Sequence, residues 1–239
     1  MIETVQRERQ GLPLPHGTIT RLRPNPKCAN TFIKTRLSSL ITTKTSQHPR
    51  QNRILEPTND LFWKKCTKEA RWLKPDQYTD LYDSVISFTV IRNPLGRLQS
   101  CYNEKVLRSE VFPSMKKLGY HNQMSFEDFV KFTCSLALCE MDVHTKPQTF
   151  LIMDSKGRLP HFVARLENLD EDWNTFSQLM LRRKVNLGGT LPRLNQSQKA
   201  TESRCSNSSL SPTVQRHYEL TYGPDIKLFE TTTGSQTEA

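Results

Sequence analysis

The sequence contains no hydrophobic run long enough to cross a membrane. A membrane-spanning helix needs about 20 consecutive apolar residues, whereas the longest apolar-rich run here covers only residues 85–91. Residues 1–8 also lack the apolar core of a signal peptide. As written, the sequence therefore predicts a protein with neither a membrane anchor nor a cleaved signal, and the cytoplasm as its compartment.

Signatures of structural zinc are missing as well. The six cysteines form no CxxC pair, and Cys134 and Cys139 have no second pair or nearby histidine at zinc-finger spacing. We therefore predict no metal site. The even number of cysteines would allow disulfides in an oxidising compartment, but the lack of a signal peptide favours free thiols.

Acidic residues are too few to balance the basic ones. Lys and Arg total 34 and Asp and Glu total 24, which gives a formal net charge of +10. The excess is confined to residues 1–120, where 21 basic and 10 acidic side chains give +11, while residues 121–239 carry −1. The first half is therefore expected to bind an anion, which could be nucleic acid, a sulfated or phosphorylated polymer, or a nucleotide.

Strand and helix patterns alternate through most of the chain. The expected strands are 16–22 and 84–91, and residues 149–153 and 161–166 are expected as strands or extended segments. The expected helices are 31–40, 61–73, 95–107, 125–138, 171–182 and 211–222. Because the strands are hydrophobic throughout, we predict an α/β, P-loop-like three-layer domain with a central, mainly parallel sheet flanked by helices. The domain is expected to cover residues 15–230, between a flexible N-terminal arm (1–14) and a disordered tail (231–239).

The first candidate site is the segment Pro26-Lys27-Cys28-Ala29-Asn30-Thr31, between a predicted strand and a predicted helix. The start of a helix exposes unpaired N–H groups and a partial positive charge. Small residues let the backbone wrap around an anion, Lys27 adds a full charge and Thr31 adds a hydroxyl donor. The glycines and the Lys-Thr pair of a nucleoside triphosphate loop are absent, which disfavours a Mg-triphosphate enzyme. The segment is either a phosphate-binding loop or an ordinary helix start after a basic residue.

The second candidate site follows the strand at 84–91 and reads Arg92-Asn93-Pro94-Leu95-Gly96-Arg97-Leu98-Gln99-Ser100. Pro94 fixes the turn, so that Arg92 keeps a set relation to the start of the next helix. Arg92 can then bind a phosphate through its guanidinium while Ser100 donates a hydrogen bond to it. The alternative is a strand-to-helix connection with solvated arginines.

Together the two segments resemble the cofactor motifs of sulfotransferases that use 3′-phosphoadenosine 5′-phosphosulfate (PAPS). In that family a P-K-x-x-x-T loop binds the 5′-phosphosulfate, and an R-[DN]-P-x-x-R-x-x-S segment binds the 3′-phosphate. The resemblance is closest to the Golgi carbohydrate branch, with its chondroitin 4-O- and HNK-1-type enzymes, and four later blocks agree with it: 126–130, 144–148, 161–172 and 222–229. Thr145 and His161 depart from the Trp and Asp that are usual in this branch.

The resemblance implies transfer of a sulfuryl group from PAPS to an acceptor hydroxyl, in a carbohydrate, by in-line displacement. Lys27 would neutralise charge on the leaving phosphate, without a metal. The PAPS-binding residues would be Lys27, Cys28, Ala29, Asn30, Thr31, Arg92, Arg97 and Ser100. Members of this branch usually carry an N-terminal membrane anchor, so the Golgi lumen is the expected compartment if this chain lacks a natural anchor.

A general base must accept the proton of the acceptor hydroxyl. His144 is the candidate, because the resemblance puts a histidine there and histidine exchanges protons near neutral pH. A turn cap is its alternative role. Glu167 is the second candidate for the base, whereas His161, just before a predicted strand, is expected to be structural.

Two other classes of function stay open. A non-enzymatic binder of RNA or a glycosaminoglycan would suit the basic first half, but no run of basic residues alternates with aromatics, so no nucleic acid partner is expected. A small-molecule kinase with a divergent phosphate loop would suit the first motif, but the Gly-Lys-Thr sequence is absent.

Overall fold

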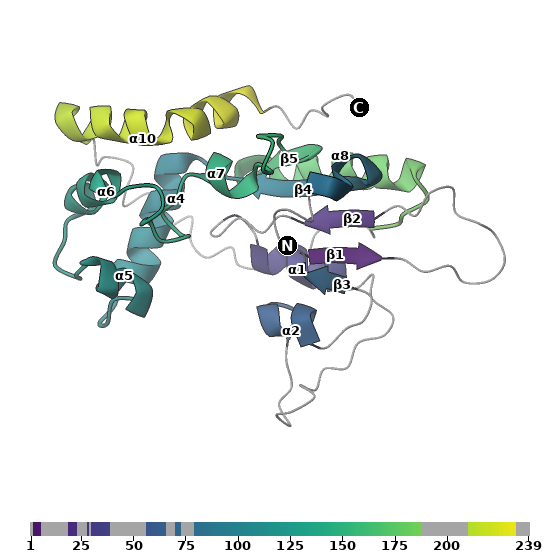
Figure 1. Ribbon diagram of the computed structural model, residues 1–239, viewed down its shortest axis with the longest axis horizontal. Helices are drawn as coiled ribbons and strands as arrows, with labels where there is room; N and C mark the ends of the chain where they lie inside the picture. Colours follow the sequence, from purple (N-terminus) through teal and green to yellow (C-terminus); the bar gives the residue numbers. More distant parts are fainter. Residues whose placement is uncertain are drawn as a thin grey trace. The chain divides into compact units, whose positions relative to one another are not determined.

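The computed structural model describes residues 2–5, 19–22, 28, 30–38, 56–65, 70–72, 79–187 and 210–232 (Figure 1). The chain divides into two compact units. The first comprises Met1–Ile91, Ile152–Pro192 and Thr232–Ala239, and the second comprises Arg92–Leu151 and Arg193–Thr231. Each unit has its own hydrophobic core.

The first unit contains a five-stranded sheet with the order β3-β1-β2-β4-β5. The strands are β1 (Ile2–Val5), β2 (Ile19–Leu22), β3 (Ala70–Trp72), β4 (Val85–Ile91) and β5 (Phe162–Arg165). In Figure 1, β4 lies between β2 and β5, and both neighbours run parallel to it, with Phe88 opposite Leu22 and Phe162. β1 and β3 complete the sheet in antiparallel pairing. The expected parallel arrangement is therefore present in β2-β4-β5, whereas the other edge is antiparallel.

Strand β1 lies in the segment that the sequence analysis assigns to a flexible arm. Ile2, Thr4 and Val5 are β-branched, a residue class that favours strands. Pairing with β2 and β3 on its two sides also satisfies the backbone groups of this strand. Residues 6–14 of the predicted arm and 233–239 of the predicted tail lie outside the described residues.

The core of the first unit lies against one face of β4. Phe88 is its centre, with ring centroids 4.5 Å from Phe176, 5.8 Å from Phe162 and 5.8 Å from Trp173. The same cluster includes residues from helices α1 (Asn30–Ser38), α2 (Asp60–Lys65) and α8 (Leu169–Arg182). These contacts support an α/β fold, while the three-layer, P-loop-like arrangement stays a prediction.

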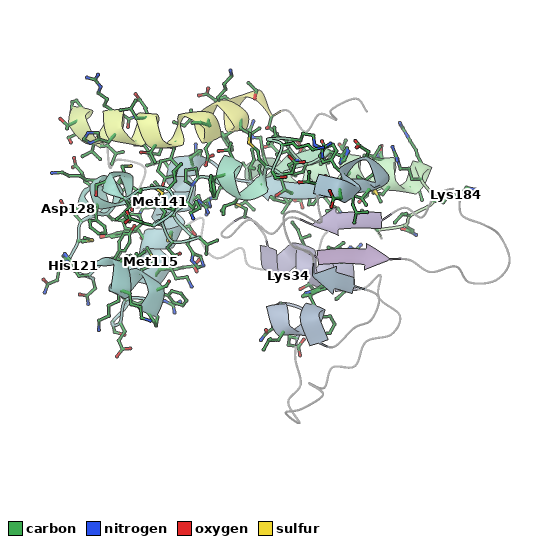
Figure 2. All side chains as sticks on the ribbon, viewed as in Figure 1. Lys34, Met115, His121, Asp128, Met141 and Lys184 are labelled. Carbon is green, nitrogen blue, oxygen red and sulfur yellow. The ribbon has the colours of Figure 1, made fainter. Side chains whose placement is uncertain are left out.

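The second unit is helical in its described part. Its helices are α4 (Pro94–Cys101), continued by the π-helical turn η2 (Tyr102–Val106), then α5 (Pro113–Leu118), α6 (Phe126–Ser135), α7 (Gln148–Ile152) and α10 (Pro212–Thr231). α10 packs against α4 and α6. Met115 and Met141, both labelled in Figure 2, are buried side chains of this unit. Among the described residues, no helix combines the length and apolarity that a membrane crossing needs.

Three predicted elements differ from the observed ones. In the range 61–73, where one helix was expected, the described residues belong to α2 and to strand β3. Residues 149–153 were expected as a strand or extended segment, but Gln148–Ile152 form helix α7. The last helix was expected to end near Tyr222, yet α10 continues through Pro224 to Thr231. Contacts of α10 with Thr145 and with the first two residues of α7, Gln148 and Thr149, account for the last two differences.

Candidate functional site

The first motif lies partly within the described residues. Lys27 and Ala29 fall outside them, and the side chains of Asn30 and Thr31 are not described. Cys28 is buried in the core of the first unit, so its side chain faces apolar neighbours. Asn30 is the first residue of α1, so the end of the predicted loop does coincide with the start of a helix.

Arg92 follows β4 directly, and the side-chain amide of Gln148 binds both its backbone N–H and its carbonyl. The Arg92 N–H donates to Oε1 of Gln148 (3.0 Å), and the Arg92 carbonyl accepts from Nε2 of Gln148 (2.8 Å). The Arg92 side chain is half-buried, and its Nε lies 3.6 Å from the position that a Cβ on Gly96 would take. The guanidinium of Arg92 therefore starts close to the first turn of α4, where a helix favours an anion.

Local sequence explains why α4 begins where it does. Asn93 is the N-cap, and its Oδ1 accepts from the Gly96 N–H at 2.9 Å. Pro94 occupies the first helical position, where its missing N–H costs nothing. Ser100 lies in the last turn of α4 and is half-buried. The predicted strand-turn-helix geometry of this motif is present.

Arg97 has a different environment from that of a solvent-facing phosphate ligand. It is 1% exposed, its Nη1 donates to the carbonyl of Lys146 (2.9 Å) and its Nη2 donates to the carbonyl of Val143 (3.0 Å). These contacts tie α4 to the segment that carries His144.

His144 is paired with a carboxylate. Its Nδ1 lies 2.6 Å from Oδ1 of Asp142, and its backbone N–H donates to the same oxygen at 2.9 Å. Partial burial by itself raises the pKa of Asp142, but hydrogen bonds from the His144 ring, the Ser114 hydroxyl and the His144 backbone outweigh it and hold the pKa well below its usual range. An ionised carboxylate at this place orients the imidazole of His144.

Helix α10 holds the other end of this segment. The Tyr222 hydroxyl donates to the carbonyl of Thr145 at 2.6 Å. Asp225, which is 1% exposed, accepts from the Gln148 N–H (2.6 Å), the Thr149 N–H (2.8 Å) and the Thr149 hydroxyl (2.7 Å). Residues 92–100, 142–149 and 222–225 therefore form one hydrogen-bonded assembly, which we call the Gln148 assembly.

Sequence reasoning identified some members of this assembly and missed others. His144, Arg92 and Arg97 were singled out, whereas Asp142, Gln148 and Asp225 were given no role. The Asp-x-His spacing at 142–144 is the signal that could have identified Asp142. Glu167, the second candidate for the base, is exposed in the turn η3 (Leu166–Asn168) of the first unit. In the described part of the chain, no three His, Cys, Asp or Glu side chains group as metal ligands would.

One comparison with known proteins identified a match. A family model described as "Sulfotransferase family" matches residues 26–230. The matched range contains both predicted motifs and all members of the Gln148 assembly. Searches of curated proteins and of solved structures returned no significant match.

Proposed function

Because this chain belongs to the sulfotransferase family, we propose that it transfers a sulfuryl group from PAPS to a hydroxyl of a carbohydrate acceptor by in-line displacement. Sulfuryl transfer as such is the reaction that the family match supports. PAPS as donor and a glycan as acceptor are our proposals, and they rest on the resemblance to the Golgi chondroitin 4-O- and HNK-1-type branch. We also propose that residues 15–230 act as one sulfotransferase domain.

The donor would be held by both sequence motifs. Lys27, with the backbone of residues 28–31 and the Thr31 hydroxyl, would hold the 5′-phosphosulfate. Arg92 and Ser100 would hold the 3′-phosphate. The environment of Arg92 supports its role as a phosphate ligand. Its main chain is fixed by Gln148, and its Nε atom lies beside Gly96 in the first turn of α4. Arg97 would position the segment that carries His144, because it links α4 to the carbonyls of Val143 and Lys146.

The chemistry would come from positioning and charge stabilisation. The acceptor oxygen attacks sulfur in line with the leaving phosphate oxygen, Lys27 neutralises the charge that develops on that phosphate, and His144 accepts the hydroxyl proton. These groups supply the charge and the proton acceptor from the protein itself, so no metal is included in the proposal.

The observation that carries the proposal is the Gln148 assembly. Three blocks that were quoted for the resemblance lie far apart in the sequence, yet Gln148 binds Arg92 while Asp225 binds Gln148. A random likeness in short blocks would give no reason for them to be hydrogen-bonded to one another. Their mutual contacts support the view that the blocks serve one site.

The proposal is tested by thermal unfolding with adenosine ligands. Addition of 3′,5′-adenosine bisphosphate is expected to raise the Tm, whereas 5′-AMP and ATP-Mg should hardly change it, because only the bisphosphate carries the 3′-phosphate. A shift with ATP-Mg alone would favour a kinase, and a shift with polyanions alone would favour a binding module. Either result contradicts the proposed function.

Arg92→Ala gives the sharper test. Loss of a charge-assisted hydrogen bond is expected to weaken bisphosphate binding at least about tenfold. Arg108→Ala is the matched control, because Arg108 is an exposed arginine of the same unit. Equal binding by the two variants would refute the assignment of the 3′-phosphate site. The acceptor class is then tested by sulfate transfer from labelled PAPS across a glycan panel, with small alcohols and phenols as controls.

A further inference from the structure

Asp142 fixes the orientation of the His144 ring. One carboxylate oxygen, Oδ1, is shared by the backbone N–H and the Nδ1 atom of His144, at 2.9 and 2.6 Å. The His144 side chain is 21% exposed and the Asp142 side chain 7%. The imidazole can therefore be reached by a substrate, while the carboxylate that orients it is largely covered.

The other carboxylate oxygen is held from α5. The Ser114 hydroxyl donates to Oδ2 of Asp142 at 2.5 Å. In a hydrolase triad the serine contacts the histidine, whereas here the serine contacts the carboxylate. Ser114 therefore supports Asp142 and is not placed as a nucleophile activated by His144.

The contacts also determine which ring nitrogen carries the proton. A carboxylate can only accept hydrogen bonds, so Nδ1 must be protonated to donate to Asp142. The lone pair of the neutral ring then lies on Nε2. Within the described part of the chain, Nε2 makes no hydrogen bond to protein, and the ring packs edge-on against Phe112, with centroids 5.9 Å apart. Nε2 is thus the basic atom that a substrate can meet.

We propose that Asp142 is a positioning residue for the proton-transfer step: it keeps His144 in the tautomer with a free Nε2 lone pair and stabilises the imidazolium that forms. The inference rests on the proposed function. In the step, the acceptor oxygen bonds to sulfur, the bond from sulfur to the bridging phosphate oxygen breaks, and the acceptor proton moves to Nε2. The products are a sulfate ester and 3′,5′-adenosine bisphosphate, and His144 afterwards gives its proton to water.

Three other charged or titratable groups lie near this pair. Arg97 of α4 binds the carbonyls of Val143 and Lys146 on either side of His144. Lys105 of η2 lies 4.2 Å above the ring of Phe112. Tyr120 is close enough for the charge on Asp142 to affect it, although burial is the main cause that raises the Tyr120 pKa to about 12. Asp142, in contrast to these three groups, bonds the His144 ring directly.

Nitrogen NMR of the His144 ring tests the orientation without any acceptor. We expect the Nδ1–H tautomer in the wild type and a change in Asp142→Ala toward the Nε2–H tautomer, which an unpaired histidine side chain favours. Asp142→Asn keeps an oxygen acceptor and is expected to keep the wild-type tautomer. Ser114→Ala is the matched control, because it removes a hydrogen bond to Asp142 but leaves the bond to His144. An unchanged tautomer in Asp142→Ala overturns the inference.

Kinetics then separate positioning from a structural role. Turnover is measured with labelled PAPS and unsulfated chondroitin as the acceptor probe, or by PAPS hydrolysis where chondroitin does not react. Asp142→Ala is expected to lower kcat about 100-fold with an unchanged KM for PAPS, and Asp142→Asn to recover part of the loss. A fall in PAPS affinity with unchanged kcat would refute the inference.

Failure of the inference can be told from failure of the proposed function. If the wild type does not bind 3′,5′-adenosine bisphosphate, the proposed function is wrong and the inference falls with it. If the wild type and Asp142→Ala bind the bisphosphate equally but share one tautomer and one kcat, the inference alone is wrong.

Discussion

Replacing Asp225 by alanine is expected to destabilise the second unit more than most single substitutions do. Asp225 is 1% exposed and accepts three hydrogen bonds, from the backbone N–H groups of Gln148 and Thr149 and from the Thr149 hydroxyl. The alanine variant leaves these three donors without their acceptor in a place that water reaches poorly. The two backbone groups are at the start of α7, where no helical carbonyl can replace the lost carboxylate.

The expected loss of unfolding free energy follows from these contacts. A buried donor that loses its partner costs about 1–3 kcal/mol. Because the three donors share one acceptor and the segment can relax, the sum is not fully additive, and we expect a loss of about 3–5 kcal/mol. Asp225→Asn retains one oxygen, yet it turns an amide N–H₂ toward one of the donors. Its loss should therefore be intermediate, at about 2 kcal/mol.

Urea unfolding followed by circular dichroism measures the loss. Glu230→Gln is the matched control, since Glu230 is an exposed carboxylate on the same helix and should change stability by less than about 0.5 kcal/mol. Bisphosphate binding should also weaken in Asp225→Ala, because Gln148 then holds the main chain of Arg92 less firmly. A loss below about 1 kcal/mol for Asp225→Ala would refute this account of the Gln148 assembly.

Two further predictions concern Arg97 and His161. Arg97→Ala should lower the unfolding free energy by about 3 kcal/mol, because it removes a fully buried side chain and its two hydrogen bonds to the carbonyls of Lys146 and Val143. Urea unfolding of this variant beside Arg108→Ala measures the loss, and equal stability of the two variants would contradict this account of Arg97. Burial lowers the pKa of His161 from its usual 6.5, opposed by Asp83 and aided by Arg183 and Arg158. As the pH falls, the unfolded chain therefore binds a proton at His161 before the folded chain does. The unfolding free energy should be highest above about pH 6.5, fall as the pH drops below that value, and become constant below the pKa of His161 in the folded chain. His161→Asn, which offers an oxygen where Nδ1 accepts from Ser87, should flatten this fall in a series of Tm values against pH, and an equally steep fall in the variant would contradict the assignment.

Features that a short stretch of sequence determines were predictable. The strand β4 was expected at 84–91 and occupies Val85–Ile91, because a run of β-branched and aromatic residues, interrupted only by Ser87, suits a strand buried on both faces. Ser125 and Asp128 were expected to cap a helix, and both reciprocal hydrogen bonds of the capping box are present. Asn93 and Pro94 similarly start α4.

Features that depend on distant partners were not predictable. Residues 149–153 are all bulky or β-branched and show no helical spacing, so a strand or extended segment was the natural expectation. They begin a helix because Asp225, 76 residues away along the chain, caps Thr149. Gly223 and Pro224 normally end a helix, but α10 continues because Tyr222 and Asp225 on either side of them are fixed by residues 145–149. The burial of Arg97 likewise depends on carbonyls that lie 46 and 49 residues away.

The same long-range contacts place constraints on the candidate site. Arg92 is held by Gln148, and the segment with His144 is held by Arg97, so the proposed 3′-phosphate ligand and the proposed base belong to one hydrogen-bonded body. A change at Gln148 or Arg97 should therefore alter donor binding and proton transfer together, whereas a change at Asp142 should alter proton transfer alone. If the second motif were only a solvated connection, Arg92 and Arg97 would need no such contacts with residues 143–148. Double-mutant cycles between Arg92 and Gln148 should accordingly show a coupling energy above about 0.5 kcal/mol in bisphosphate binding, and independent effects would favour the solvated alternative.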